Sequence, residues 1–141
     1  MRYSFKNKRI LIIDRQKYWR EMAADTLAGA NSQIALLDNY DYRDKASYFP
    51  EAKAPDLVIL GCVQIGDEER ELIHRVLADG LHLMIFSTLL PWEEMRHLFH
   101  EGADDVTDKT YDQKRLINAV EGVFNARQGD SYQRAEEKGL L

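Results

Sequence analysis

Three short, continuous apolar segments dominate the hydrophobic pattern of the chain. They are residues 10–13 (Ile-Leu-Ile-Ile), 57–60 (Leu-Val-Ile-Leu) and 83–86 (Leu-Met-Ile-Phe). Two weaker segments of similar length cover residues 33–37 and 103–107. Because the apolar residues are consecutive rather than alternating, the pattern predicts strands that are buried on both faces, as in a parallel sheet. The sequence therefore predicts five strands, the fifth of them near an edge.

Helical patterns separate these segments. Apolar residues recur at helical spacing over residues 16–29, 67–79, 91–101 and 112–126. Three of these patterns end at or just before a glycine, which is typical of a helix C-terminus. A poorer pattern covers residues 42–52, where a proline falls late in the segment. We expect that fifth helix to be short and irregular, because proline disrupts the interior of a helix.

The regular alternation of strands and helices predicts an α/β fold with a doubly wound parallel sheet. Right-handed crossovers then place helices on both faces of the sheet. In such sheets, ligands bind beyond the carboxyl ends of the strands. This rule directs attention to Asp14-Arg15, Gly61-Cys62, Ser87-Thr88 and the segment after Val106.

The length and composition fit a single domain. Of the 141 residues, we expect residues 1–7 to form an N-terminal arm, residues 8–126 the domain and residues 127–141 a polar tail or helix extension. The net charge of −5 argues against a direct nucleic-acid partner. No apolar stretch approaches the roughly 20 residues that span a bilayer, and no signal peptide opens the chain. We therefore expect a cytoplasmic protein without a membrane partner.

The chain resembles the receiver domain of bacterial response regulators over about residues 8–126. The segments that carry the resemblance are the strand ending in Asp14, Pro-Asp-Leu-Val-Ile-Leu at 55–60, Ile-Phe-Ser at 85–87 and Glu-Gly-Ala-Asp-Asp at 101–105. The most specific part is the last segment together with Lys109, which stands where the family carries its lysine. The resemblance implies a flavodoxin-like (βα)5 fold with strand order 2-1-3-4-5.

The resemblance also implies phosphoryl transfer onto an aspartate at the end of the third strand. A magnesium ion, held partly by an acidic pair after the first strand, would shield the incoming charge. Here the acidic pair reads Asp14-Arg15, and the acceptor position reads Gly61. Ser87 and Lys109 stand where the family binds the phosphoryl oxygens. The nucleophile and one metal ligand are therefore missing.

These departures predict a degenerate receiver, or pseudo-receiver, that is not an enzyme and holds no metal or cofactor. Magnesium requires hard oxygen ligands in near-octahedral geometry, and a guanidinium beside the remaining carboxylate opposes its binding. We expect Asp14 to pair with Arg15 or with Lys109, which would neutralise the pocket. Asp56 is a poor substitute acceptor, because it precedes the third strand and would lie at the other end of the sheet.

Two other functions for the pocket remain open. Arg15, Ser87 and Lys109 are candidates to bind an anion or a small metabolite, which would make the chain a ligand sensor. Cys62 is either a small buried residue or a redox-sensing thiol whose pKa the neighbouring cations lower.

A protein-binding face is the remaining candidate for function. In the receiver family, the face formed by the fourth helix, fifth strand and fifth helix binds partners or a second copy. The residues on that face that we single out are Trp92, Arg96, Tyr111, Lys114 and Arg115. Exposed aromatic and arginine side chains are enriched at interface cores. The sequence therefore favours phosphorylation-independent binding of a protein partner or homodimerisation within bacterial signal transduction.

Overall fold

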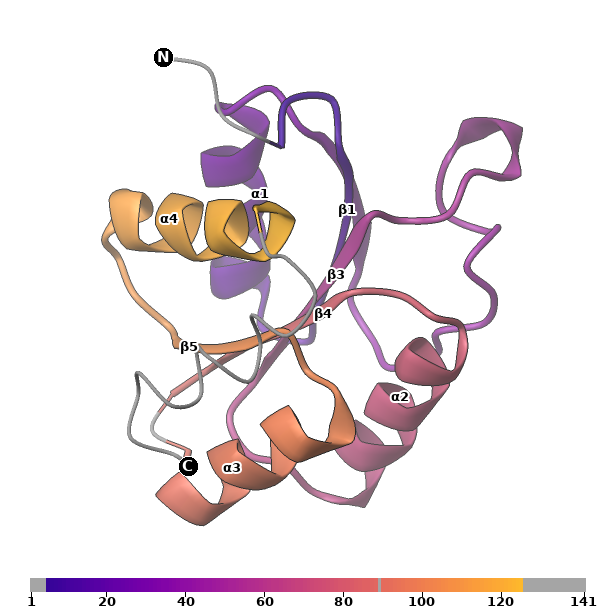
Figure 1. Ribbon diagram of the computed structural model, residues 1–141. Helices are drawn as coiled ribbons and strands as arrows, with labels where there is room; N and C mark the ends of the chain where they lie inside the picture. Colours follow the sequence, from indigo (N-terminus) through magenta and orange to yellow (C-terminus); the bar gives the residue numbers. More distant parts are fainter. Residues whose placement is uncertain (1–4, 89, 126–141) are drawn as a thin grey trace.

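Five parallel strands form the centre of the computed structural model, which describes residues 5–88 and 90–125 (Figure 1). The strands are β1 (Arg9–Asp14), β2 (Gln33–Leu37), β3 (Leu57–Cys62), β4 (Leu83–Ser87) and β5 (Asp105–Asp108). Their order in the sheet is β2-β1-β3-β4-β5. The flavodoxin-like doubly wound sheet and its strand order are confirmed.

Among the described residues, four helices cover the two faces of the sheet (Figure 1). They are α1 (Lys17–Ala28), α2 (Asp67–Ala78), α3 (Trp92–Glu101) and α4 (Gln113–Phe124). One buried cluster packs α1 and α4 against β1, β3 and β4, with Leu27 and Val120 at its centre. A second cluster packs α2 and α3 against the other face, with Leu72 and Leu98 buried. Strands β1, β3 and β4 are buried almost throughout, which explains their continuous apolar sequences.

The connection between β2 and β3 contains no α-helix, so the helix expected over residues 42–52 is wrong. Its only helical element is a 3-10 turn, η1 (Pro50–Ala52), and both Glu51 and Ala52 have positive φ angles, which an α-helix does not allow. Aromatic side chains cover the sheet there instead. Tyr42 is fully buried in the α2–α3 cluster, stacks on Tyr48 at 5.9 Å between ring centroids and donates its hydroxyl hydrogen to Asp79.

The packed unit extends to residue 5 at the N-terminus. Phe5 is completely buried against the α1–α4 face and stacks on Phe124 at 6.1 Å between ring centroids. Phe5, which falls within the arm expected over residues 1–7, is therefore packed against the α1–α4 face. Residues 1–4 of that arm and the tail expected over residues 127–141 lie outside the described residues.

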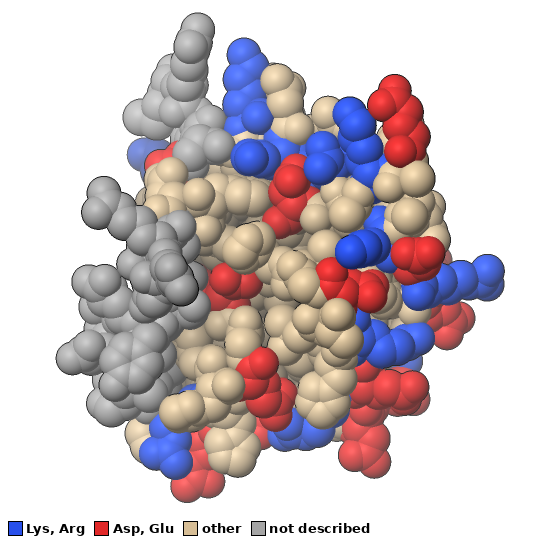
Figure 2. Space-filling model, turned by 45° about the vertical axis from the view of Figure 1, so that its right-hand side comes forward, with Lys and Arg blue, Asp and Glu red and all other residues tan. Residues whose placement is uncertain are grey.

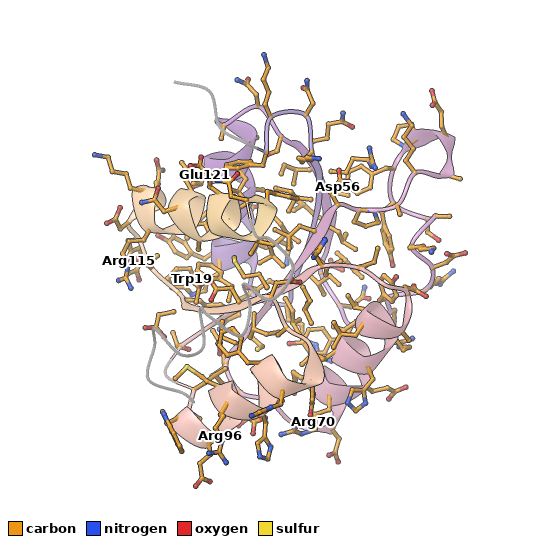
Figure 3. The ribbon with its side chains drawn as sticks, viewed as in Figure 1. Trp19, Asp56, Arg70, Arg96, Arg115 and Glu121 are labelled. Carbon is orange, nitrogen blue, oxygen red and sulfur yellow. The ribbon has the colours of Figure 1, made fainter. Side chains whose placement is uncertain are left out.

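The register of the strands determines what meets at their carboxyl ends. Asp14 is paired with Gly61 across β1 and β3, and Cys62 is paired with Ser87 across β3 and β4. Asp56 lies at the opposite end of β3, where Arg9 binds it through both its backbone and its side chain (Figure 3). Asp56 is thus far from the pocket and occupied by a structural ion pair. No helix among the described residues has the length and apolarity needed to cross a membrane.

Candidate functional site

The carboxyl ends of β1, β3 and β4 bring four of the five predicted pocket residues together. Asp14 ends β1, Gly61 lies beside it in β3, and Ser87 ends β4. The loop after β5 is held to this edge because the Lys109 backbone N–H donates to the Ser87 carbonyl at 2.9 Å. Lys109 therefore reaches the pocket from the loop after the fifth strand, as its position in the sequence predicts.

Gly61 is required because the Asp14 carboxyl group occupies the space above it. A Cβ atom at position 61 would lie 1.9 Å from Asp14 Oδ2 and 2.5 Å from its carboxyl carbon. Such contacts are far inside van der Waals separation, so any side chain here forces Asp14 to move. The position of the missing acceptor is therefore filled by the neighbouring strand's carboxylate.

Lys109 holds the Asp14 carboxylate in this place. Its Nζ atom lies 2.9 Å from Asp14 Oδ2, and both side chains are almost completely buried. The same ammonium donates to Gln16 Oε1 at 2.9 Å, and the Gln16 backbone N–H donates to Asp14 Oδ1 at 2.8 Å. Lys109 Nζ also lies 5.5 Å from the ring centroid of Trp19. Buried charges are tolerated only when they are paired and hydrogen-bonded to this degree.

Arg15 is not part of this arrangement. Its guanidinium points away from Asp14, binds the Glu68 carboxylate and stacks 3.8 Å above the ring of Tyr40. The hydrogen bond to Glu68 is the main cause of the raised pKa of Arg15. Of the two partners expected for Asp14, the structure therefore selects Lys109, and Arg15 forms a half-exposed ion pair with helix α2.

Cys62 and Ser87 are both buried beside the pocket. Burial raises the pKa of the Cys62 thiol to about 11 and outweighs the opposing effects of Ser87 and Lys109. The lowered thiol pKa that the redox-sensor hypothesis requires is therefore not found. The Ser87 hydroxyl makes no hydrogen bond of normal geometry among the described residues, although it lies near enough to Cys62 to influence that thiol.

The magnesium site implied by the resemblance does not fit these residues. The second acid is replaced by Arg15, which is committed to Glu68, and the remaining carboxylate of Asp14 is neutralised by Lys109. Gly61 contributes no carboxylate. Among residues 5–88 and 90–125, no group of His, Cys, Asp and Glu side chains has the geometry to hold a metal ion.

A cavity of about 190 Å³ lies beside the pocket. It is lined by Asp14, Arg15, Gln16, Tyr40, Cys62, Val63, Gln64 and Glu69. Two carboxylates contribute to its wall, and its arginine is already paired with a third carboxylate, that of Glu68. Neither Arg15 nor Lys109 is thus available as an unpaired cation for an anionic ligand.

The residues of the predicted binding face divide into two groups. Arg96 stacks over Trp92 on α3, with the guanidinium carbon 5.1 Å from the ring centroid, and Trp92 is 48% exposed. Tyr111 is 73% exposed and belongs with α1 and α4 instead, next to Lys114 and Arg115. Figure 3 shows Arg96 and Arg115 at different edges of the molecule. Trp92 and Arg96 thus lie on α3, whereas Tyr111, Lys114 and Arg115 lie just before and at the start of α4.

The aromatic residues that surround Tyr111 were not predicted from the sequence. Its ring centroid lies 5.1 Å from that of Trp19 and 6.0 Å from that of Tyr18. Trp19 also packs edge-on against Phe86, with 5.9 Å between ring centroids. The adjacent pair Tyr18 and Trp19 at the start of the first helix could have indicated this cluster. Its pattern is equally typical of a helix that simply buries Trp19 in the core.

Several solved receiver domains share this fold. No family model and no curated protein matches the sequence. The chain resembles a CheY-like receiver domain protein from Methanospirillum hungatei, with a TM-score of 0.69 at 15% identity over 90% of this chain and 98% of that one. A receiver domain from Clostridium thermocellum gives 0.69 at 14% identity, over 84% of this chain and 94% of that one. An orphan response regulator of H. pylori gives 0.66 at 18% identity, over 85% and 99%.

The protein thus has the fold of the CheY-like response-regulator receiver domains. At these identities the likeness concerns the fold, and the chemistry of this chain depends on the residues at the carboxyl edge. Those residues are the Asp14–Lys109 pair over Gly61 and the Arg15–Glu68 pair beside it.

Replacing Gly61 by alanine should destabilise the protein, since the new Cβ would overlap the Asp14 carboxyl group. We expect the free energy of unfolding to fall by about 1–3 kcal/mol, as is usual for overpacking. Gly122→Ala is the matched control, because nothing lies within 4 Å of a Cβ at that helical position. The control should be neutral or stabilising by up to about 1 kcal/mol. Urea denaturation of both variants measures the difference, and equal effects would contradict the close approach.

Replacing Lys109 by methionine should leave the Asp14 carboxylate buried without its counter-charge. A loss of about 3–5 kcal/mol in the free energy of unfolding is expected for breaking such a pair. In the double variant Asp14→Asn/Lys109→Met, the loss should be smaller than the sum of the two single losses. A double-mutant cycle from chemical denaturation measures this coupling. Additive losses would show that the two groups do not interact.

The thiol of Cys62 should resist alkylation in the folded protein. With its pKa raised to about 11, the group stays protonated at pH 8, and the thiolate is the reactive form. Iodoacetamide should therefore label Cys62 only after unfolding in denaturant, which intact-mass measurement follows over time. Rapid labelling of the native protein at pH 8 would refute the buried, neutral thiol.

Proposed function

We propose that the chain is a pseudo-receiver in bacterial signal transduction, acting by phosphorylation-independent protein–protein interaction or dimerisation. The observation that supports this most strongly is the Asp14 carboxylate over Gly61, held there by the buried Lys109 ammonium. Such a receiver is not an enzyme and does not require a metal or cofactor. Its output is the binding of a protein partner or of a second copy of the chain.

The chemistry of phosphoryl acceptance explains why this pocket argues for such a role. Transfer needs a carboxylate nucleophile at the third strand and a cation to balance the charge of the incoming group. Gly61 supplies no nucleophile, and Asp14 cannot substitute freely because its carboxylate is fixed by Lys109 and the Gln16 backbone N–H. Lys109, the cation that would stabilise a phosphoryl group, is already engaged by Asp14 and Gln16.

Two partly exposed groups of side chains are candidates for the binding surface. The first consists of Trp92 and Arg96 on α3, and the second of Tyr111 with Lys114 and Arg115 at the start of α4. Aromatic and arginine side chains that remain exposed in a folded monomer are typical of protein interfaces. The net charge of −5 favours a protein over a nucleic-acid partner, and basic and acidic side chains are interspersed on the face shown in Figure 2.

A ligand-sensing role remains the second candidate. The cavity of about 190 Å³ at the sheet edge is its support. An anionic ligand would have to displace Glu68 from Arg15 or Asp14 from Lys109, and each displacement opposes binding. The pseudo-receiver role requires no such rearrangement.

Small phosphodonors should fail to phosphorylate the protein. Acetyl phosphate and Mg²⁺ are incubated with the chain and, in parallel, with a receiver domain that retains its acceptor aspartate. Intact-mass spectrometry should show the phosphoryl adduct on that control and none on this chain. Mapping an acyl phosphate to any aspartate of this protein, by borohydride reduction followed by mass spectrometry, would refute the proposal.

A further inference from the structure

The outer edge of β2 is unpaired in the described structure. β2 is the first strand of the sheet and bonds only to β1. The Gln33 N–H donates to the Lys8 carbonyl at 2.9 Å, so Gln33 directs its backbone groups toward β1. Because these groups alternate in direction along a strand, Ile34 and Leu36 direct their N–H and C=O groups outward. These two residues therefore present hydrogen-bonding groups along an open edge.

This edge lacks the features with which proteins usually block edge pairing. Such features include proline, charged residues and β-bulges. The strand reads Gln-Ile-Ala-Leu-Leu, which contains no proline and no charge. Its register with β1 runs over five consecutive residue pairs without a bulge. Leu36 leaves 47% of its surface exposed beside the edge. An edge with these properties is suited to pair with another strand.

We propose that β2 pairs antiparallel with β2 of a second copy of the chain, about a two-fold axis at Ala35. In this register, Ile34 of each copy faces Leu36 of the other, and the outward N–H and C=O groups of both residues are satisfied. Ala35 faces Ala35 in a non-hydrogen-bonded position, where the two strands approach most closely. A small side chain suits that position.

The chemistry of the edge favours a second copy as the partner. The strand is uncharged, so two copies do not repel each other at the pairing line. Directly opposite residues point to the same face of a sheet, so the exposed Leu36 would pack against Ile34 of the other copy. An isologous contact of this kind closes as a dimer rather than growing into a fibre. The short strand predicts weak, concentration-dependent association. This inference does not depend on the state of the Asp14–Lys109 pocket.

A cysteine at the two-fold axis tests the register directly. In Ala35→Cys, the two new thiols would lie about 4.5 Å apart between Cα atoms, within the range that a disulfide bridges. Gln33→Cys is the matched control, because position 33 faces position 37 of the other copy and its two thiols would lie far apart. Native Cys62 is buried and does not compete. Under mild oxidation, non-reducing electrophoresis should show a covalent dimer at least tenfold more abundant for Ala35→Cys.

Variants at Leu36 test whether the edge itself mediates the pairing. In the Ala35→Cys background, Leu36→Pro removes the outward N–H while proline remains tolerable at a sheet edge. Leu36→Lys places a charge at the edge, which also opposes pairing. This variant replaces Leu36→Pro in the test if the proline variant loses its circular-dichroism signal and is therefore unfolded. Either folded variant should reduce cross-linking at least tenfold. Three results would overturn the proposal. The first is no cross-linking in Ala35→Cys, and the second is equal cross-linking in Ala35→Cys and Gln33→Cys. The third is a yield of cross-linked dimer that the folded Leu36 variants leave unchanged.

Discussion

The buried ion pair between Asp14 and Lys109 is the interaction on which the carboxyl edge of this protein depends. The carboxylate cannot be buried without the ammonium, and the ammonium cannot be buried without the carboxylate. Together they require glycine at position 61, because any side chain there would overlap the Asp14 carboxyl group. The pair also connects β1 to the loop after β5, across the two strands that lie between them. One charge pair therefore fixes both the content of the pocket and the position of a loop.

Because this pair is satisfied internally, the pocket has little left with which to bind another group. Gln16 accepts a hydrogen bond from the Lys109 ammonium, and Glu68 forms an ion pair with the guanidinium of Arg15. Burial keeps the nearby Cys62 thiol neutral. The fold of a receiver domain is thus retained while the groups that would exchange a phosphoryl group are bound to each other. We infer that the surfaces around α3, α4 and the β2 edge carry the function.

Much of this arrangement could be predicted from the sequence, and the failures have physical causes. Consecutive apolar residues identified the buried strands, since a strand covered on both faces needs no polar side. The absence of an acceptor at Gly61 was equally visible. The choice between Arg15 and Lys109 as the partner of Asp14 was not, because adjacent residues in an extended strand point to opposite faces and the loop decides where Arg15 goes. The helix expected over residues 42–52 was wrong. Pro50 begins only a 3-10 turn with positive φ angles at Glu51 and Ala52, and buried Tyr42 covers the sheet in place of a helix.

Nuclear magnetic resonance can show whether the Asp14–Lys109 pair already occupies the acceptor position. Backbone amide spectra are recorded before and after adding Mg²⁺ and beryllofluoride, which mimics a phosphoryl group on an aspartate. If the pair holds the position, the amides of Asp14, Gly61, Ser87 and Lys109 keep their chemical shifts throughout the titration. Saturable shifts at these four amides would instead show that the pocket can release its internal pair and accept the mimic.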